Sequence, residues 1–168
     1  MIRRPPRSTL DRSSAASDVY KRQDNGTKIL GICLGSQLVA DSLDGEAYLS
    51  DEIEFGFKNL NFVRNEEIFS DFQDTEVFTW HRDTFKIPSK AKLIAETDFP
   101  QIYKIKNTVC IQFHPEVTVE LFDKWYESEV SKKELKNYDR ELTRNKLMNY
   151  ENSMNQKVNS FYKKWKDT

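Results

Sequence analysis

Residues 31–37 have the sequence GICLGSQ, in which a cysteine stands between two glycines at a tight turn. The apolar run KILGI at 28–32 leads into this turn and reads as a short buried strand, and the residues after the cysteine read as a helix. A nucleophile at such a strand–turn–helix junction has a strained backbone, so its close neighbours must be small. Gly31 and Gly35, two residues to either side of Cys33, meet that need.

The surroundings expected for Cys33 favour a reactive thiolate. Its sulfur would lie near the first turn of the following helix, whose N-terminal amide groups stabilise negative charge. The backbone N–H of Leu34, the next residue, would point to where an oxyanion forms when the sulfur attacks a carbonyl carbon. The alternative is a buried structural cysteine in a glycine-flanked loop, and the motif alone leaves both interpretations open.

A second stretch, IQFHPEV at residues 111–117, carries the groups that such a thiol requires. His114 and Glu116 follow a predicted strand at positions i and i+2, where extended backbone directs both side chains to the same side. Pro115 restricts the backbone between them. Glu116 can then fix the tautomer of His114, and the imidazole can take the proton of Cys33. A lone histidine at a strand end is more often a solvated or capping residue, but the two stretches together predict one Cys–His–Glu site.

Short strands and helices must bring these groups together. The apolar pattern predicts helices over residues 36–43 and 66–72, and strands over 28–32, 75–79, 92–97, 101–106 and 108–113, with two more within 46–63. After Pro115 the chain has no Gly or Pro, and apolar residues recur at helical spacing, which predicts amphipathic helix. This helical part either packs on the body of the protein or on another copy, or it binds a partner.

The chain is expected to have three segments. Residues 1–23 are basic and rich in Ser, Arg and Pro, and they resemble peptides translated from sequencing-adapter read-through at the ends of metagenomic gene fragments. We interpret them as a non-native leader, with a nucleic-acid-binding arm as the alternative. Residues 24–130 are predicted to form the domain that carries the site, and residues 131–168 a helical C-terminal extension.

Composition narrows the classes of function. The whole chain has a net charge of -1, and without the basic leader the remainder is more acidic still, which gives no support to nucleic-acid binding. No apolar run reaches the roughly 20 residues that cross a bilayer, so no membrane partner is expected. Two cysteines do not make a disulfide framework, and two histidines and two cysteines at scattered spacing argue against a zinc site. The sequence therefore predicts a cytoplasmic protein that needs no metal or other cofactor.

The two motifs together resemble those of the class I, or triad-type, glutamine amidotransferases, a family that includes the glutaminase domain of GMP synthase. GICLGSQ is similar to the G-x-C-x-G-x-Q motif of that family and IQFHPEV to its F-H-P-E motif. EFGF at 54–57 and TWHRD at 79–83 resemble two segments that lie between these motifs in the family. The resemblance covers residues 28–120 and implies a flavodoxin-like α/β fold with a mostly parallel sheet flanked by helices, here without its first strands and with a helical C-terminal tail.

The resemblance also implies an activity, the hydrolysis of the side-chain amide of L-glutamine to glutamate and to ammonia for a biosynthetic acceptor. Cys33 would attack the amide and form a γ-glutamyl thioester, and His114 would pass a proton to the leaving ammonia and then activate water. Glu116 would orient His114, and the Leu34 amide would be one oxyanion donor.

The residues implied at the substrate site are neighbours of the nucleophile and one histidine from the TWHRD segment. Gln37 corresponds to a family glutamine that contacts the bound substrate, and Gly31 and Gly35 would flank it. His81 would line the pocket. For His81 the alternative is an exposed loop residue beside Trp80.

The chain departs from the family pattern in two places. The first strands of the family and a glycine-bearing loop that gives a second oxyanion N–H are not recognisable in residues 1–23, so the chain is expected to be N-terminally truncated and weakly active or inactive. No ammonia-using synthase domain follows residue 120, which implies a stand-alone enzyme or a subunit that passes ammonia to a separate synthase. Two alternatives stay open: a γ-glutamyl peptide or amide hydrolase with the same triad, and a regulatory or interaction subunit without activity.

Overall fold

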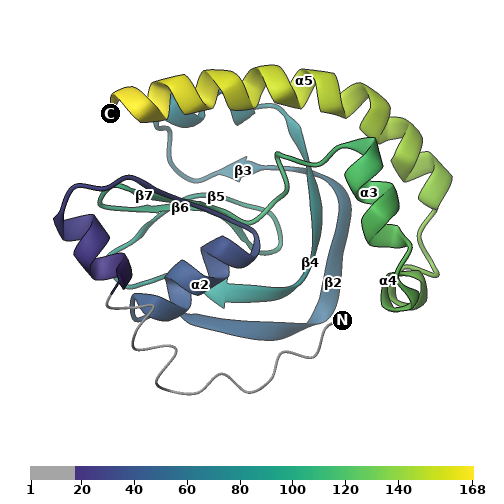
Figure 1. The fold of residues 1–168 in the computed structure, drawn as a ribbon, viewed down its shortest axis with the longest axis horizontal. Helices are drawn as coiled ribbons and strands as arrows, with labels where there is room; N and C mark the ends of the chain where they lie inside the picture. The colour runs from purple at the N-terminus through teal and green to yellow at the C-terminus, as the bar shows by residue number, and fades with distance from the viewer. Residues whose placement is uncertain (1–17) are drawn as a thin grey trace. The chain divides into compact units, whose positions relative to one another are not determined.

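A computed structural model of the chain describes residues 18–168. These residues form two compact units, one over residues 18–114 that contains the strands and one over residues 115–168 that is helical (Figure 1). The boundary between the units falls inside the HPE sequence, between His114 and Pro115.

The first unit contains a five-stranded sheet within its described residues. Its strand order is β1-β7-β6-β5-β3. The strands are β1 (Ile29–Ile32), β3 (Asn61–Phe62), β5 (Lys92–Glu96), β6 (Pro100–Ile105) and β7 (Thr108–Ile111). Helix α2 (Leu34–Ser42) follows β1 and packs against it, and a 3-10 helix, η1 (Glu67–Phe72), lies between β3 and the next strand.

The pairing within this sheet is mixed. Strand β1 runs parallel to β7, whereas β7, β6, β5 and β3 pair antiparallel. The α/β class is confirmed, but this part of the sheet differs from the mostly parallel sheet that was expected. The physical reason is the length of the connections, since the two-residue link Lys106–Asn107 allows only an antiparallel return from β6 to β7.

A second, two-stranded sheet pairs β2 (Glu46–Asn59) with β4 (Glu76–Lys86). Where two short strands were expected within residues 46–63, one long strand runs to Asn59 and the chain then enters β3 in the other sheet. The β4 strand is also longer than predicted, because it continues through the TWHRD segment. Edge-to-face aromatic pairs, Phe55 with Phe78 and Phe55 with Trp80, stabilise the long pairing.

The core of the first unit lies between α2 and the sheets. Its buried cluster contains Val39, Ala40, Leu43, Phe85, Tyr103, Ile105 and Cys110. Cys110 is fully buried there, as expected for a cysteine that packs as a small apolar side chain. Burial raises the pKa of Cys110 to about 12, so its thiol carries its proton at neutral pH.

Part of the predicted leader packs on this core. Residues 1–17 lie outside the described residues, whereas residues 18–24 form a helix (Figure 1). Val19 packs against the core cluster, and the buried Gln23 amide donates a hydrogen bond to the Thr108 hydroxyl at 2.7 Å, at the start of β7. Residues 18–23 therefore contribute to the first unit.

The second unit consists of three helices, α3 (Val119–Tyr126), α4 (Glu129–Glu134) and α5 (Arg140–Asp167). The predicted C-terminal helix is thereby confirmed. Asp123 of α3 joins α5 through ion pairs to Arg140 at 3.0 Å and to Arg144 at 2.9 Å. Side chains cap all three helices at their N-termini, with Thr118, Ser128 and Asp139 each accepting a backbone N–H. Among residues 18–168, none of these or the other helices is both long and apolar enough to cross a membrane.

The buried thiol of Cys110 makes the stability of the first unit sensitive to alkaline pH. An acid whose pKa is raised by folding adds stability below its ordinary pKa of 9.0, and this stability is lost as the pH rises toward 12. We expect the free energy of unfolding to fall by up to about 1.4 kcal/mol per pH unit more steeply in the parent than in Cys110→Val. Urea unfolding of both proteins below and above pH 9.0 tests this, and parallel pH curves would contradict it.

Candidate active site

Cys33 stands at the junction of β1 and α2 in an unusual backbone conformation. Its φ is 46° and its ψ is -105°, a combination that residues with a side chain rarely adopt. The Cys33 N–H donates a 2.8 Å hydrogen bond to the carbonyl of Ile111 at the end of β7. Ser36 and Gln37 then donate their backbone N–H groups to the Cys33 carbonyl, which closes the first turn of α2. The elbow expected from the sequence is therefore present at Cys33.

The two flanking glycines have different surroundings. A Cβ at Gly31 would lie 2.9 Å from the backbone carbonyl carbon and oxygen of Gly35, so no larger residue fits there without moving the turn. A Cβ at Gly35 would meet no heavy atom within 4 Å. Packing thus explains Gly31, whereas the space beside Gly35 is open.

The sulfur of Cys33 is partly exposed and receives one hydrogen bond from the interior. The side-chain amide nitrogen of Gln112 donates to Sγ over 3.6 Å. Gln112 directly follows β7, and Ile32 is paired with Ile111 in the parallel register. The GICLGSQ and IQFHPEV motifs therefore meet at the same end of the β1–β7 pair.

His114 is buried and lies three residues beyond the end of β7, with 7% of its surface exposed. Its backbone N–H donates a 2.8 Å hydrogen bond to the carbonyl of Phe78 on β4. This bond ties the histidine to the second sheet, while Ile111 ties the same segment to Cys33. The roles of Cys33 and His114 in a common proton transfer stay predictions.

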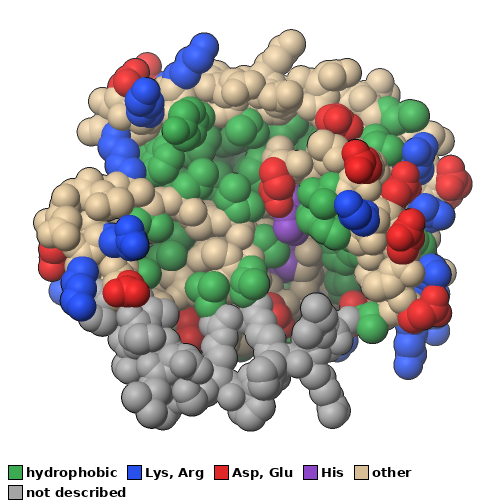
Figure 2. Space-filling view, viewed as in Figure 1, with side chains coloured by type: hydrophobic (Ala, Val, Ile, Leu, Met, Phe, Trp, Pro, Cys, Tyr) green, Lys and Arg blue, Asp and Glu red, His purple; other side chains and the backbone are tan. Residues whose placement is uncertain are grey.

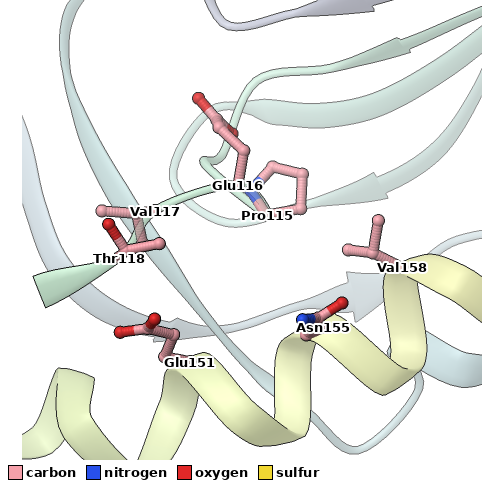
Figure 3. Close-up of a pocket in the computed structure, with 7 residues that line it drawn as sticks. All are labelled: Pro115, Glu116, Val117, Thr118, Glu151, Asn155 and Val158. Carbon is pink, nitrogen blue, oxygen red and sulfur yellow. The ribbon is translucent and has the colours of Figure 1, made fainter. Parts of the chain in front are cut away.

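Glu116 belongs to the second unit and is exposed. It lines a pocket of about 230 Å³ between the segment before α3 and helix α5, where its carboxylate points away from α5 (Figure 3). The other lining residues are Pro115, Val117, Thr118, Glu151, Asn155 and Val158. Glu151 of α5 accepts a 3.1 Å hydrogen bond from the Val119 N–H, so α5 holds the start of α3 just after Glu116.

Gln37 is 2% exposed and lies one turn into α2. Its side-chain nitrogen donates to the backbone carbonyl of Asp83 at 2.9 Å and to the side-chain oxygen of Gln112 at 3.2 Å. The two protons of this nitrogen are thus shared between β4 and the segment after β7. A contact between Gln37 and a bound substrate would use its remaining amide oxygen, and it stays a prediction.

His81 is 6% exposed and lies within β4, so the alternative of an exposed loop residue is wrong. Its Nε2 lies 2.8 Å from a carboxylate oxygen of Glu54, its cross-strand partner on β2. Its Nδ1 lies 3.1 Å from the Asp83 carbonyl. Both ring nitrogens face acceptors, which favours a doubly protonated imidazole paired with a Glu54 carboxylate.

Sequence reasoning missed the polar residues that surround this pair and the nucleophile. The side chains of Gln101 and Thr97 donate to the Glu54 carboxylate at 2.7 and 2.6 Å, and Gln112 donates to the sulfur. A weak signal was available, because Gln101 and Gln112 are polar side chains at the edges of apolar strands. Polar residues at such positions are usually buried only when they have hydrogen-bond partners.

The face of the molecule shown in Figure 2 carries acidic and basic side chains intermixed over the described atoms. Such a surface differs from the continuous basic stripe of a nucleic-acid-binding face.

Comparisons with known proteins identify relatives of this chain. The family model "Glutamine amidotransferase class-I" matches residues 8–132. A GMP synthase (glutamine-hydrolyzing) of Clostridium botulinum is 35% identical over 121 residues, which are 68% of this chain and 22% of that protein. The chain therefore spans about a fifth of the length of the curated relatives it matches.

Solved structures share the fold. A glutamine amidotransferase from Thermotoga maritima, 26% identical, aligns with a TM-score of 0.81 over 92% of this chain and 69% of that chain. A glutamine amidotransferase from Methylobacillus flagellatus, 21% identical, gives a TM-score of 0.80 over 92% of this chain and 68% of that chain. These likenesses confirm the expected fold.

The close approach of Gly31 to Gly35 gives a matched pair of substitutions. Gly31→Ala forces a Cβ against backbone atoms and is expected to lower the free energy of unfolding by about 1–3 kcal/mol. Gly35→Ala places the same methyl group in open space within a helix, so stability should stay the same or rise by up to about 1 kcal/mol. Urea unfolding followed by circular dichroism compares the two, and equal losses would contradict this packing.

Proposed function

The chain belongs to the class I glutamine amidotransferase family, and from that premise we propose that it hydrolyses the side-chain amide of L-glutamine to glutamate and ammonia. The observation that carries this proposal is the backbone of Cys33, which has a positive φ at a strand–helix turn. Strained backbone of this kind concentrates at functional sites, where it holds a reactive group in place. The parallel register of β1 and β7 supports the proposal further, because it brings the histidine-bearing segment to the same edge.

The reaction proceeds in two steps. In the first, the Cys33 sulfur forms a bond to the amide carbon of glutamine, the carbon–nitrogen bond breaks, and His114 gives the departing nitrogen the proton that it took from the thiol. In the second, His114 takes a proton from water, the resulting hydroxide attacks the thioester carbon, and the sulfur leaves. Glutamate and ammonia are released and the thiol is restored.

The negative oxygen that develops in each step requires hydrogen-bond donors. The N–H of Leu34 is the second residue of the elbow and, like other amides of a first helical turn, has no partner within its helix. It therefore serves as one oxyanion donor. The open space beside Gly35 gives the substrate room to approach the sulfur from the solvent side.

Glu116 orients His114 and stabilises its positive charge between the two proton transfers. Helix α5 contributes by holding the segment that carries Glu116, through the hydrogen bond from Val119 to Glu151. The buried His81–Glu54 pair supports the β2–β4 wall of the substrate site. Gln37, Gly31 and Gly35 line the floor below the nucleophile.

The ammonia is proposed to pass to a biosynthetic acceptor on a separate synthase subunit. The relatives named GMP synthase are several times longer than the region that this chain matches, which supports a division of the two half-reactions. A reducing cytoplasmic setting suits the two free thiols of the chain, Cys33 and Cys110.

The nucleophile is tested by ammonia release from L-glutamine. Cys33→Ala is expected to lower kcat by about 10³-fold or more, because no other group can form the thioester. Cys110→Val is the control and should keep the parental rate, since its thiol is buried and protonated. Ammonia release by Cys33→Ala at the parental rate would refute the proposal. The same assay with a γ-glutamyl anilide separates a glutaminase from a γ-glutamyl amide hydrolase.

The role of Glu116 is tested with a matched acid. Glu116→Gln keeps the shape of the side chain but removes its charge, and kcat is expected to fall by about 10²–10⁴-fold with little change in KM. Glu120→Gln removes an exposed carboxylate one turn further along, in α3, and should leave kcat unchanged. Equal activity of the two variants would remove Glu116 from the mechanism.

A further inference from the structure

We propose that Gln112 is a positioning residue for the nucleophile: its side-chain N–H holds the Cys33 sulfur, and Gln37 fixes the Gln112 amide in that orientation. The inference rests on the proposed function, because Cys33 is the nucleophile there. It adds a residue that does not touch the substrate and that transfers no proton.

The contact itself is well defined. Gln112 is fully buried, and its side-chain nitrogen lies 3.6 Å from Sγ of Cys33, within the longer reach of a hydrogen bond to sulfur. Its backbone is fixed as well, since the Gln112 N–H donates a 2.8 Å hydrogen bond to the carbonyl of Gln101. The amide therefore reaches the sulfur from the interior, opposite to solvent.

The orientation of a glutamine amide has to be deduced from its partners, because its oxygen and nitrogen are similar in shape. The chain of partners here begins at the backbone carbonyl of Asp83, which can only accept. Gln37 must turn its NH₂ group toward that carbonyl, at 2.9 Å, and the second proton of the same nitrogen then points to Gln112, at 3.2 Å. Gln112 must meet this donor with its oxygen, which leaves its NH₂ group facing the sulfur.

Ser36 contributes less to this orientation. Its hydroxyl lies 3.5 Å from the Gln112 side-chain oxygen, but it lies 2.6 Å from the Cys33 carbonyl. A hydroxyl has a single proton, and the shorter bond takes it. Gln37 is thus the residue that sets the Gln112 amide, and the Asp83 carbonyl is the fixed point behind both.

The chemical consequence follows from the charge on the sulfur. A hydrogen bond is stronger when its acceptor is ionised, so an N–H directed at Sγ favours the thiolate over the thiol. The same bond limits the rotation of the Cys33 side chain. Both effects speed the attack of the sulfur on any electrophile, whether or not glutamine is bound.

Alkylation of Cys33 by iodoacetamide measures this effect without glutamine turnover. The rate at the Cys33 peptide, followed by mass spectrometry, is expected to fall about tenfold in Gln112→Met, which keeps the length of the side chain but donates no hydrogen bond. Gln112→Glu should fall further, because it places a carboxylate oxygen against the sulfur. Gln23→Met, which removes another buried amide at the far end of β7, is the matched control and should stay within about twofold of the parent.

Gln37→Met tests the orientation. Without its donor the Gln112 amide is free to turn its oxygen toward the sulfur, so alkylation should slow by about threefold or more. Circular dichroism and urea unfolding establish that each variant is folded. Should Gln112→Glu fail to fold, Gln112→Met decides the question, because it adds no charge to the interior.

The outcomes separate this inference from the proposed function. Alkylation of Gln112→Met and Gln37→Met within about twofold of the parent would overturn the positioning role, whatever the glutaminase activity. A slowed alkylation in a parent protein that releases no ammonia from glutamine would support the positioning role and sink the glutaminase proposal. In an active parent, Gln112→Met should lower kcat while leaving KM close to the parental value.

Discussion

The parallel register of β1 and β7 is the constraint on which the rest of the first unit depends. It pairs Ile32 with Ile111, so both strands end at one level and the residues that follow them emerge together. The hydrogen bond from the Cys33 N–H to the Ile111 carbonyl closes this end. A slip of one residue would turn every side chain of a strand to its other face and would carry Gln112 away from the sulfur.

Behind the nucleophile the interior is polar, and its hydrogen bonds connect three elements. Gln37 of α2, Gln112 after β7 and the Asp83 carbonyl of β4 share donors and acceptors in a single row. The His81–Glu54 pair joins the same carbonyl from the other side. Buried polar groups are costly when unpaired, so a network of this kind specifies one arrangement of the two sheets around α2.

The parts of the site that are local in sequence could be predicted, and the parts that depend on register could not. The elbow at Cys33 follows from small residues two positions away, and the His-Pro-Glu stretch follows from its place at a strand end. The contact of Gln112 with the sulfur and the pairing of Glu54 with His81 need the strand alignment, which no single stretch reveals. The mixed sheet was missed for a similar reason, because short connections such as Lys106–Asn107 decide strand direction pair by pair.

The boundary between the two compact units runs between His114 and Pro115, which assigns the imidazole to one unit and the carboxylate to the other. A chimera joined at that boundary would therefore present a foreign acid to a native base, even though each half kept its own packing. Exchange of the helical part between relatives calls for a junction beyond Val117, so that the HPE sequence travels whole with the nucleophile.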